Sequence, residues 1–175
     1  MDYECITPVS YSLLVNDEPS GLIRPTRGIR QGDPLSPYIF ILCMEALSSA
    51  LLKESLQSKI GIGIKLSTGS ERIPCLLFAD DCLLFCKVDI TTCRKLKSLL
   101  DSFCAHSGQF INYHKSTLTF SINATTSHRQ VAAGIFSITH SDSLGKYLRC
   151  PIFQKRPNVA TFRELVDKAM TKLVG

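Results

Sequence analysis

The chain has 175 residues, of which 45% are hydrophobic and 20% are charged, and its formal net charge is +5. This composition is typical of a globular domain and excludes a disordered tail, a collagen-like rod and a coiled coil. No apolar run reaches the roughly 20 residues that span a bilayer, and the N-terminus lacks the features of a signal peptide. We therefore expect an intracellular protein without a membrane-spanning segment.

The positive charge is concentrated in the C-terminal part of the chain. After Gly145 the only acidic side chains are Glu164 and Asp167. The basic side chains there are Lys146, Arg149, Lys155, Arg156, Arg163, Lys168 and Lys172. Such a segment suits a phosphate backbone, although an ordinary solvated surface would show the same pattern.

The eight cysteines form no C-x-x-C pair, so the spacing of a zinc site is absent. Most of them lie among apolar neighbours, as Cys43 does. Because no secretion signal is recognisable, we expect reduced thiols that pack as small hydrophobes rather than a disulfide framework.

The first third of the chain predicts a hairpin, a loop and a long helix. Residues 9–15 are typical of a strand, residues 16–21 of a turn, and residues 22–24 of a returning strand. Residues 27–37 hold several Gly and Pro residues and predict a loop. Ser36 is expected to cap a helix and Pro37 to open it, with apolar side chains at helical spacing to about residue 58.

The rest of the chain interleaves short strands with helices. An apolar stretch at 60–66 and a turn at 67–70 precede residues 75–86, which predict a buried hairpin with two acids at its tip. Residues 91–107 predict a helix that Gly108 ends. Strands are expected at 117–121 and 146–149, and helices near 127–136 and 159–173. The fold class predicted from this alternation is α+β.

Asp80 and Asp81 are the sharpest chemical feature, because they interrupt an otherwise apolar run. Desolvating an unpaired carboxylate costs several kcal/mol, and two adjacent negative charges add to that cost. A bound cation is one way in which such a pair is stabilised. The alternative is an exposed turn whose acids face water, since Asp is a common turn residue.

A second feature is the loop before the long helix. It combines Arg27, Arg30 and Gln31 with glycines that let a ligand approach the backbone, and it lies just before a helix N-terminus. This combination suits a nucleotide phosphate. Arg30 could equally pair with Asp33.

In this order, these segments resemble the reverse transcriptase domain of non-LTR (LINE-type) retrotransposons, particularly those of plants. Residues 27–42 look like motif B, residues 78–81 like motif C with its catalytic aspartates, residues 107–116 like motif D, and residues 146–148 like the start of motif E. The resemblance covers essentially the whole chain, and the order and spacing of the four motifs fit.

The resemblance implies a polymerase palm subdomain at residues 1–144, and the motif E region with the start of the thumb connection at 145–175. It implies an RNA-directed DNA polymerase that adds dNTPs to a DNA primer on an RNA template, with two Mg²⁺ ions, acting in the nucleus. The resemblance implies that Asp80 and Asp81 are catalytic metal ligands and that Lys115 is a general acid. It places Arg30, Gln31 and Gly32 at the nucleotide. The residues that it places at the primer and template are Phe78, Ala79, Lys146, Tyr147 and Leu148.

The resemblance also shows two departures. Residues 5–21 look like the hairpin that the family places between motifs A and B, so the motif A aspartate is expected to lie upstream of Met1. Neighbouring strand residues point to opposite faces, and Asp80 and Asp81 therefore need a carboxylate from an adjacent strand. Motif E is altered as well, because Arg149 and Cys150 follow Leu148 where the family usually has Gly and Leu.

From these patterns we expect part of a larger palm that is inactive by itself. Three alternatives stay open: an enzyme completed by an upstream segment, a degenerate remnant that binds nucleic acid without sequence preference, and a structural domain that has lost the chemistry. A group II intron maturase also has a palm, but residues 30–37 and the Phe-first aspartate motif fit the LINE type better.

Overall fold

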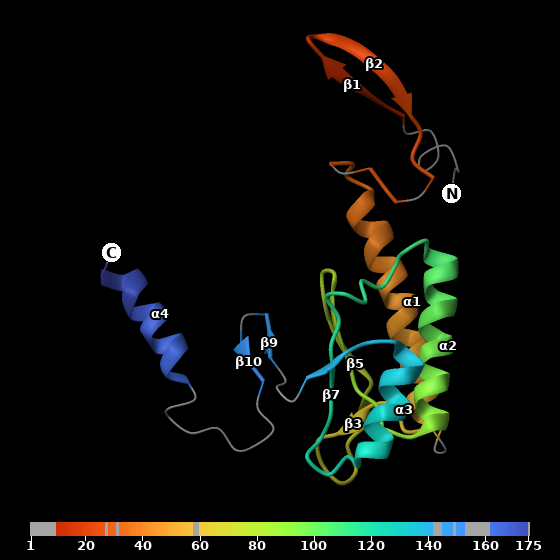
Figure 1. Cartoon of the computed structure of the whole chain (residues 1–175), viewed down its shortest axis with the longest axis vertical. Helices are drawn as coiled ribbons and strands as arrows, with labels where there is room; N and C mark the ends of the chain where they lie inside the picture. Colours follow the sequence, from red (N-terminus) through yellow and green to blue (C-terminus); the bar gives the residue numbers. More distant parts are fainter. Residues whose placement is uncertain are drawn as a thin grey trace. The chain divides into compact units, whose positions relative to one another are not determined.

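A computed structural model describes residues 10–26, 28–30, 32–57, 60–141, 145–148, 150–152 and 162–174 (Figure 1). The chain divides into two compact units, Met1–Asn112 and Tyr113–Gly175. Within the described residues the strands pair two by two, antiparallel except for the parallel pair β7–β8. Helices thus alternate with small sheets, which confirms the α+β class.

The first hairpin has a tighter turn than the sequence pattern predicts. Strands β1 (Tyr11–Val15) and β2 (Glu18–Ile23) leave only Asn16 and Asp17 between them, and Val15 pairs with Glu18. Both turn residues have positive φ, 53° and 65°. This is the pattern of a type I′ turn, which Asn and Asp tolerate better than most residues. The predicted six-residue turn is therefore wrong.

Helix α1 (Ser36–Leu56) begins at the expected place but with a different cap. Leu35 occupies the N-cap position without a side-chain cap. The Ser36 hydroxyl instead donates to the Arg30 carbonyl oxygen at 2.7 Å, so the predicted cap at Ser36 is wrong. The Asp33 carboxylate takes part of the capping role by accepting the Leu35 N–H at 2.8 Å.

Helix α2 (Ile90–Ser107) agrees with its prediction at both ends. Asp89 caps its N-terminus, and Gly108 ends it in the left-handed conformation with φ 70°. Helices α1 and α2 lie side by side (Figure 1), and the Lys95 Nζ to Glu54 Oε1 ion pair of 3.0 Å links them. The buried apolar side chains of this unit are Leu47, Leu51, Ile62, Cys93, Leu96 and Leu100.

Four short strands follow α1. Strand β3 (Ile64–Lys65) pairs with β4 (Arg72–Ile73), and β5 (Cys75–Phe78) pairs with β6 (Asp81–Leu84). The ladder continues past β6, because the Phe85 N–H donates to the Pro74 carbonyl at 2.9 Å and the Phe85 carbonyl accepts the Gly63 N–H at 2.7 Å. The predicted hairpin at 75–86 is thereby confirmed as a backbone feature.

The second unit contains shorter strands than expected. Its elements are β7 (Leu118–Thr119), α3 (Thr126–Phe136), β8 (His140–Ser141), β9 (Lys146–Tyr147), β10 (Cys150–Pro151) and α4 (Arg163–Val174). The Thr125 hydroxyl caps α3 by accepting the His128 N–H at 3.3 Å. The start of the last predicted helix, at residue 159, lies outside the described residues.

The cysteines whose side chains are described are free thiols, but their burial varies. Cys93 is buried, Cys82 is exposed, and Cys43, Cys75, Cys86 and Cys104 lie between these extremes. The expectation of burial is therefore wrong for Cys82. Among the helices in the described part of the chain, none has the length and apolarity to cross a membrane.

Candidate functional site

The two aspartates lie at the tip of the β5–β6 hairpin. Phe78 pairs with Asp81, so that only Ala79 and Asp80 form the turn. Ala79 has φ 48°, whereas Asp80 does not share this positive φ. A positive φ at the first of two turn residues is the pattern of a type II′ turn, which usually has Gly at that position. We call Phe78, Ala79, Asp80 and Asp81 the tip.

The pairing register gives the hairpin two distinct faces. Directly opposed residues of an antiparallel pair point to the same face, so Phe78 and Asp81 share one face with Leu76 and Leu83. Phe78 is 60% exposed and Leu76 42%. Asp81 is exposed as well. This outer face is therefore an exposed apolar surface with a carboxylate at its end.

The inner face of the hairpin packs toward α1. Cys75 and Leu84 form one of its opposed pairs, and Leu77 and Cys82 form the other. Burial raises the pKa of the Cys75 thiol, and a hydrogen bond to Ser48 of α1 only partly offsets this. Strand β5 is in contact with α1, so the helix supports this face. The helix thus holds the hairpin while the tip stays in solvent.

The prediction of a buried hairpin is wrong at the tip, where Asp80 and Asp81 are both exposed. A continuous apolar run indicates a strand but does not say which of its faces is covered. Because the two carboxylates remain solvated, the desolvation cost expected from the sequence does not arise here. The alternative of turn acids that face water describes the geometry of this chain.

The donor chemistry of the tip fits a hard cation. Carboxylate oxygens are the ligands that Mg²⁺ prefers, and the turn brings two of them together on adjacent residues. Among the described residues, however, no group of three or more His, Cys, Asp or Glu side chains could hold a metal ion. The tip therefore supplies part of a magnesium site, and further ligands are needed to complete it.

The loop before α1 is organised by its backbone. Gly28 and Gly32 both have φ 86°, and a Cβ atom at either position would meet nothing within 4 Å. The Arg30 carbonyl accepts the Ser36 hydroxyl, and Asp33 is engaged with the Leu35 N–H. Arg30 and Asp33 are both described and form no ion pair with each other. Arg30 is exposed. Gln31 lies outside the described residues.

The remaining predicted residues lie in the second unit, whereas the aspartates lie in the first. Lys115 is exposed in a turn at residues 113–115. Lys146 and Tyr147 form β9, which pairs with β10, and Leu148 begins the intervening turn with φ 52°. Arg149 and the Lys146 side chain lie outside the described residues. The structure thus groups the tip residues and leaves the other predicted residues on separate segments.

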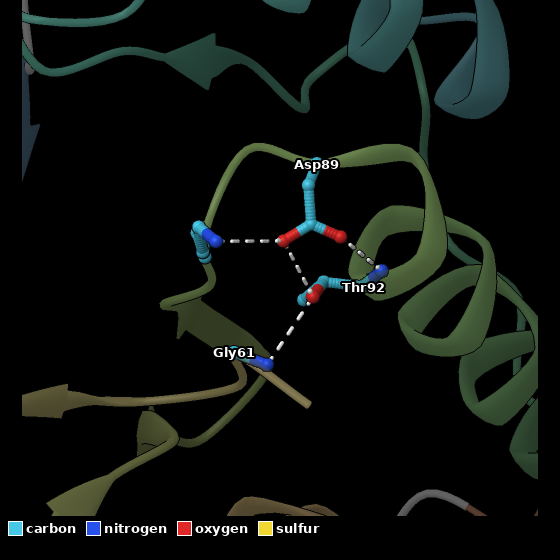
Figure 2. A network of polar contacts seen from close by, with 4 residues as sticks. Gly61, Asp89 and Thr92 are labelled. Atoms are coloured by element: carbon cyan, nitrogen blue, oxygen red, sulfur yellow. Dashed lines mark hydrogen bonds and ion pairs between the residues drawn. The ribbon is translucent and has the colours of Figure 1, made fainter. Parts of the chain in front are cut away.

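A polar network that the sequence patterns did not predict lies at the point where β6 leads into α2 (Figure 2). Asp89 Oδ1 accepts the Thr92 N–H at 2.9 Å, and Asp89 Oδ2 accepts the Thr92 hydroxyl at 3.0 Å. The Thr92 oxygen in turn accepts the Gly61 N–H at 3.2 Å. We call Gly61, Ile62, Lys87, Asp89 and Thr92 the junction. Asp at the residue before a helical pattern was the available signal.

The electrostatics of the junction favour an ionised Asp89. Its partial burial by itself raises the pKa of the carboxyl group. The hydrogen bonds from Thr92 and the Lys87 ammonium, whose Nζ lies 3.8 Å from Oδ2, outweigh this effect. The pKa of Asp89 is therefore held below its usual value.

Comparison with known proteins adds independent information. Residues 3–156 match the sequence model of a family described as "Reverse transcriptase (RNA-dependent DNA polymerase)". Over 68 residues the chain is 53% identical to an uncharacterized mitochondrial protein of Arabidopsis thaliana. These 68 residues are 39% of this chain and 55% of that protein.

Two further relatives carry the name "Retrovirus-related Pol polyprotein from type-1 retrotransposable element R2". The one from Popillia japonica is 40% identical over 90 residues, which are 51% of this chain and 12% of the polyprotein. The one from Nasonia vitripennis is 44% identical over 62 residues, 35% of this chain and 5% of the polyprotein. The chain thus spans about half of the Arabidopsis relative and a small part of each polyprotein.

Proposed function

This chain belongs to the reverse transcriptase (RNA-dependent DNA polymerase) family, and we propose that it forms the palm part of an RNA-directed DNA polymerase of a non-LTR, LINE-type retrotransposon. The reaction would add dNTPs to the 3′-hydroxyl of a DNA primer on an RNA template. The observation that carries this proposal is the exposed pair Asp80 and Asp81 on a two-residue hairpin turn. The similarity to two R2 polyproteins supports the element type.

In this proposal Asp80 and Asp81 hold Mg²⁺ at the tip, with Asp80 the principal ligand. When bound, the ions would polarise the phosphate oxygens and the primer hydroxyl. The exposed position of both carboxylates supports this role, because primer and nucleotide must reach them from solvent. Phe78 and Ala79 lie on the same tip and would contact the primer terminus.

The other proposed contacts come from separate segments. Arg30, Gln31 and Gly32 would border the nucleotide, where the exposed Arg30 guanidinium could meet a phosphate. Lys115 would donate a proton to the leaving pyrophosphate. Tyr147, Leu148 and Lys146 would contact the primer backbone. In this proposal residues 1–144 form the palm, and residues 145–175 lead to the thumb. The proposed site of action in the cell is the nucleus.

We further propose that catalysis requires one more carboxylate than the tip supplies. Two-metal transfer uses ions about 3.5–4 Å apart, and two adjacent aspartates offer too few ligands for both. Among the described residues, no third acidic, His or Cys side chain completes a cluster with them. We therefore expect the chain to be inactive by itself and active when a strand with that carboxylate is joined to it.

The alternative proposal is a nucleic-acid-binding remnant without catalysis. The observation that favours it is helix α4, where Arg163, Lys168 and Lys172 are all exposed. Such binding would be independent of sequence and would weaken steeply with salt. It would not require Asp80 or Asp81.

The first test measures metal binding. The chain is titrated with Mn²⁺ as a Mg²⁺ analogue, and bound Mn²⁺ is followed by electron paramagnetic resonance. We expect Asp80→Asn to weaken binding at least tenfold, and the matched variant of an exposed acid off the tip, Glu71→Gln, to bind like the wild type. Equal binding by wild type and Asp80→Asn would contradict the role of Asp80.

The second test measures primer extension on an RNA template with Mg²⁺. We expect none from the chain by itself, and extension that Asp80→Asn abolishes when the chain is joined to the coding sequence upstream of Met1. Extension by the chain alone would contradict the need for another carboxylate. The remnant would be favoured if neither the chain alone nor the joined chain extends the primer, and if nucleic-acid binding is salt-sensitive and unchanged by Asp80→Asn.

A further inference from the structure

The β1–β2 hairpin is exposed along its whole length. Every residue of both strands is exposed, and no third strand pairs with them among the residues that the structure describes. A two-stranded hairpin is only marginally stable in water, and further strands or a packed helix are needed to stabilise it. The hairpin is therefore a candidate surface for association. Its exposed large apolar side chains are Tyr11, Leu13, Leu14, Val15, Leu22 and Ile23.

The two edges of this hairpin are not equivalent. On β2, Pro19 pairs with Leu14, and a proline has no N–H to donate to a further strand. The pairing register also shifts between Tyr11 and Leu13, as it does at a β-bulge. Prolines, bulges and charged side chains are the features that protect sheet edges. Strand β1 has no proline and no charged side chain between Tyr11 and Val15, so its edge is open to another strand.

The turn of the hairpin determines which backbone groups of β1 point outward. Val15 and Glu18 flank the two-residue turn, and in such a turn the carbonyl of the first residue accepts the N–H of the fourth. Because hydrogen-bonded and non-hydrogen-bonded pairs alternate along an antiparallel ladder, Val15 and Leu13 bond toward β2. The N–H and C=O groups of Ser12 and Leu14 therefore point away from β2. We call these groups the β1 edge.

We propose that the β1 edge binds the β1 edge of a second copy of this chain, in antiparallel orientation and with the two-fold axis at Leu13. Ser12 of each copy then pairs with Leu14 of the other, and these are the residues whose backbone groups point outward. Leu13 lies opposite Leu13 of the second copy as a non-hydrogen-bonded pair, in which the Cα atoms are about 4.5 Å apart. The result is a four-stranded sheet in the order β2–β1–β1–β2.

The sequence of β1 is self-complementary in this register. Tyr11 of each copy lies opposite Val15 of the other, and an aromatic side chain opposite a β-branched one is among the pairs that stabilise a sheet. The two-fold axis produces this pair twice, on either side of the two Leu13 side chains. A closed interface of this kind uses the same surface patch on both copies. The pattern of β1 therefore selects a second copy as the occupant of its edge.

The charges of the hairpin favour the antiparallel orientation. Asp17 lies in the turn and Glu18 follows it, whereas Arg24 follows the other end of the hairpin, and all three are exposed. In the antiparallel arrangement, the acidic turn of one copy and Arg24 of the other lie at the same end of the sheet. A parallel arrangement would instead place both acidic turns at one end. Juxtaposed like charges suppress an arrangement, so the antiparallel pair is preferred.

The test measures self-association of the full chain by sedimentation equilibrium over a range of concentrations, and we expect a monomer–dimer equilibrium. Leu13→Lys places two ammonium groups opposite each other at the two-fold axis, and like charges directly opposed are destabilising. We therefore expect the dimer dissociation constant to rise at least tenfold. Leu22→Lys is the matched control, because Leu22 is 63% exposed against 60% for Leu13 but lies on β2. This variant should associate like the wild type.

Amide hydrogen exchange of the wild-type chain locates the interface without any variant. The N–H groups of Ser12 and Leu14 should be protected in the dimer and exchange at least tenfold faster after dilution to the monomer. The Leu13 N–H, which bonds within the hairpin, should change much less. Equal protection of Ser12 and Leu14 in dimer and monomer would overturn the proposal, and this measurement does not depend on the folding of a variant.

Three results of the sedimentation experiment would also overturn the proposal. One is a chain that stays monomeric at every concentration. Another is equal weakening by Leu13→Lys and Leu22→Lys, which would indicate unspecific apolar contact of the hairpin. The third is association that Leu13→Lys leaves unchanged and Leu76→Lys on β5 weakens, because the interface would then lie on the β5–β6 hairpin.

Discussion

The tip and the junction lie at opposite ends of β6, and their physical properties are opposite as well. At the junction, Ile62 is fully buried and Thr92 bonds to two other segments. At the tip, Asp80 and Asp81 are exposed, and the turn carries a positive φ on a non-glycine residue. Packing and hydrogen bonds therefore fix the base of the hairpin, while the groups proposed to act on a ligand are left in solvent.

The largest effect on stability is expected from a cavity at the junction. Ile62→Ala removes a side chain that is 0% exposed, and such truncations cost about 2–5 kcal/mol. The control is Ile64→Ala, two residues further along, because Ile64 is 40% exposed. Chemical denaturation measures the free energy of unfolding of both variants. An equal loss of stability in Ile62→Ala and Ile64→Ala would show that the junction is no more tightly packed than its surroundings.

A close backbone approach at the junction predicts the next effect. A Cβ atom at position 61 would lie 2.5 Å from the Lys87 Cβ atom, and overpacking of this kind costs about 1–3 kcal/mol. We therefore expect Gly61→Ala to lower the thermal midpoint. Gly134→Ala in α3 is the matched control, since a Cβ atom there meets nothing within 4 Å. A Gly61→Ala variant as stable as the wild type would mean that the two segments separate without cost.

The polar network predicts a smaller effect that depends on pH. Asp89→Ala removes the cap of α2, which costs about 1 kcal/mol. Because the pKa of Asp89 is lowered in the folded state, its charge contributes stability above the unfolded pKa of about 3.9. That contribution is lost as the pH falls through the lower folded value. Denaturation at pH 7 and at pH 2 measures the difference in free energy of unfolding between wild type and variant. We expect this difference to be smaller at pH 2.

If the difference in free energy of unfolding is the same at pH 7 and pH 2, the loss of stability in Asp89→Ala is due to helix capping that does not depend on the charge of Asp89. The matched variant is Asp101→Ala, whose carboxylate pairs with Lys97 on the exposed side of α2. Surface pairs of this kind contribute at most about 1 kcal/mol, and Asp101→Ala should leave the network of Thr92 and Gly61 unchanged.

The smallest effect, with the opposite sign, is expected at the tip. Ala79 adopts φ 48°, and a left-handed conformation costs a residue with a Cβ atom roughly 1–2 kcal/mol. Ala79→Gly relieves this strain at some cost in unfolded-state entropy, so we expect a gain of about 0.5–1 kcal/mol. Hydrogen exchange of the β5–β6 amides measures it locally. Faster exchange in Ala79→Gly would contradict the assignment of strain to this turn.

The sequence predicted the elements of this chain better than their surroundings. Both ends of helix α2 were predicted to within one residue, because the apolar spacing and the terminating Gly108 are local signals. The aspartate turn was also placed correctly, because two acids inside an apolar run are a local signal as well. The cap at Ser36 was not, since the competing acceptor is the Arg30 carbonyl, whose position depends on how the loop folds back.

Burial was the less predictable property. The apolar residues on both faces of β5 and β6 suggested a covered hairpin, but only the inner face is supported by α1. Periodicity describes a strand and not the layers that cover it. A local pattern could indicate the Asp89 cap on Thr92, but not the bond from Gly61 to Thr92, which joins segments far apart in the chain. The roles of Lys115, Gln31 and Tyr147 remain predictions from the family resemblance.

The two-stranded character of the β5–β6 sheet has a consequence for how the chain associates. Among the described residues no third strand pairs with β5 or β6, and unpaired strand edges readily accept another strand. Under the proposed function, a strand carrying the further carboxylate would add its main-chain hydrogen bonds at such an edge, next to the apolar outer face of Phe78 and Leu76. The same edge could template the hairpin of a second molecule, so completion of the site and aggregation would compete for one surface.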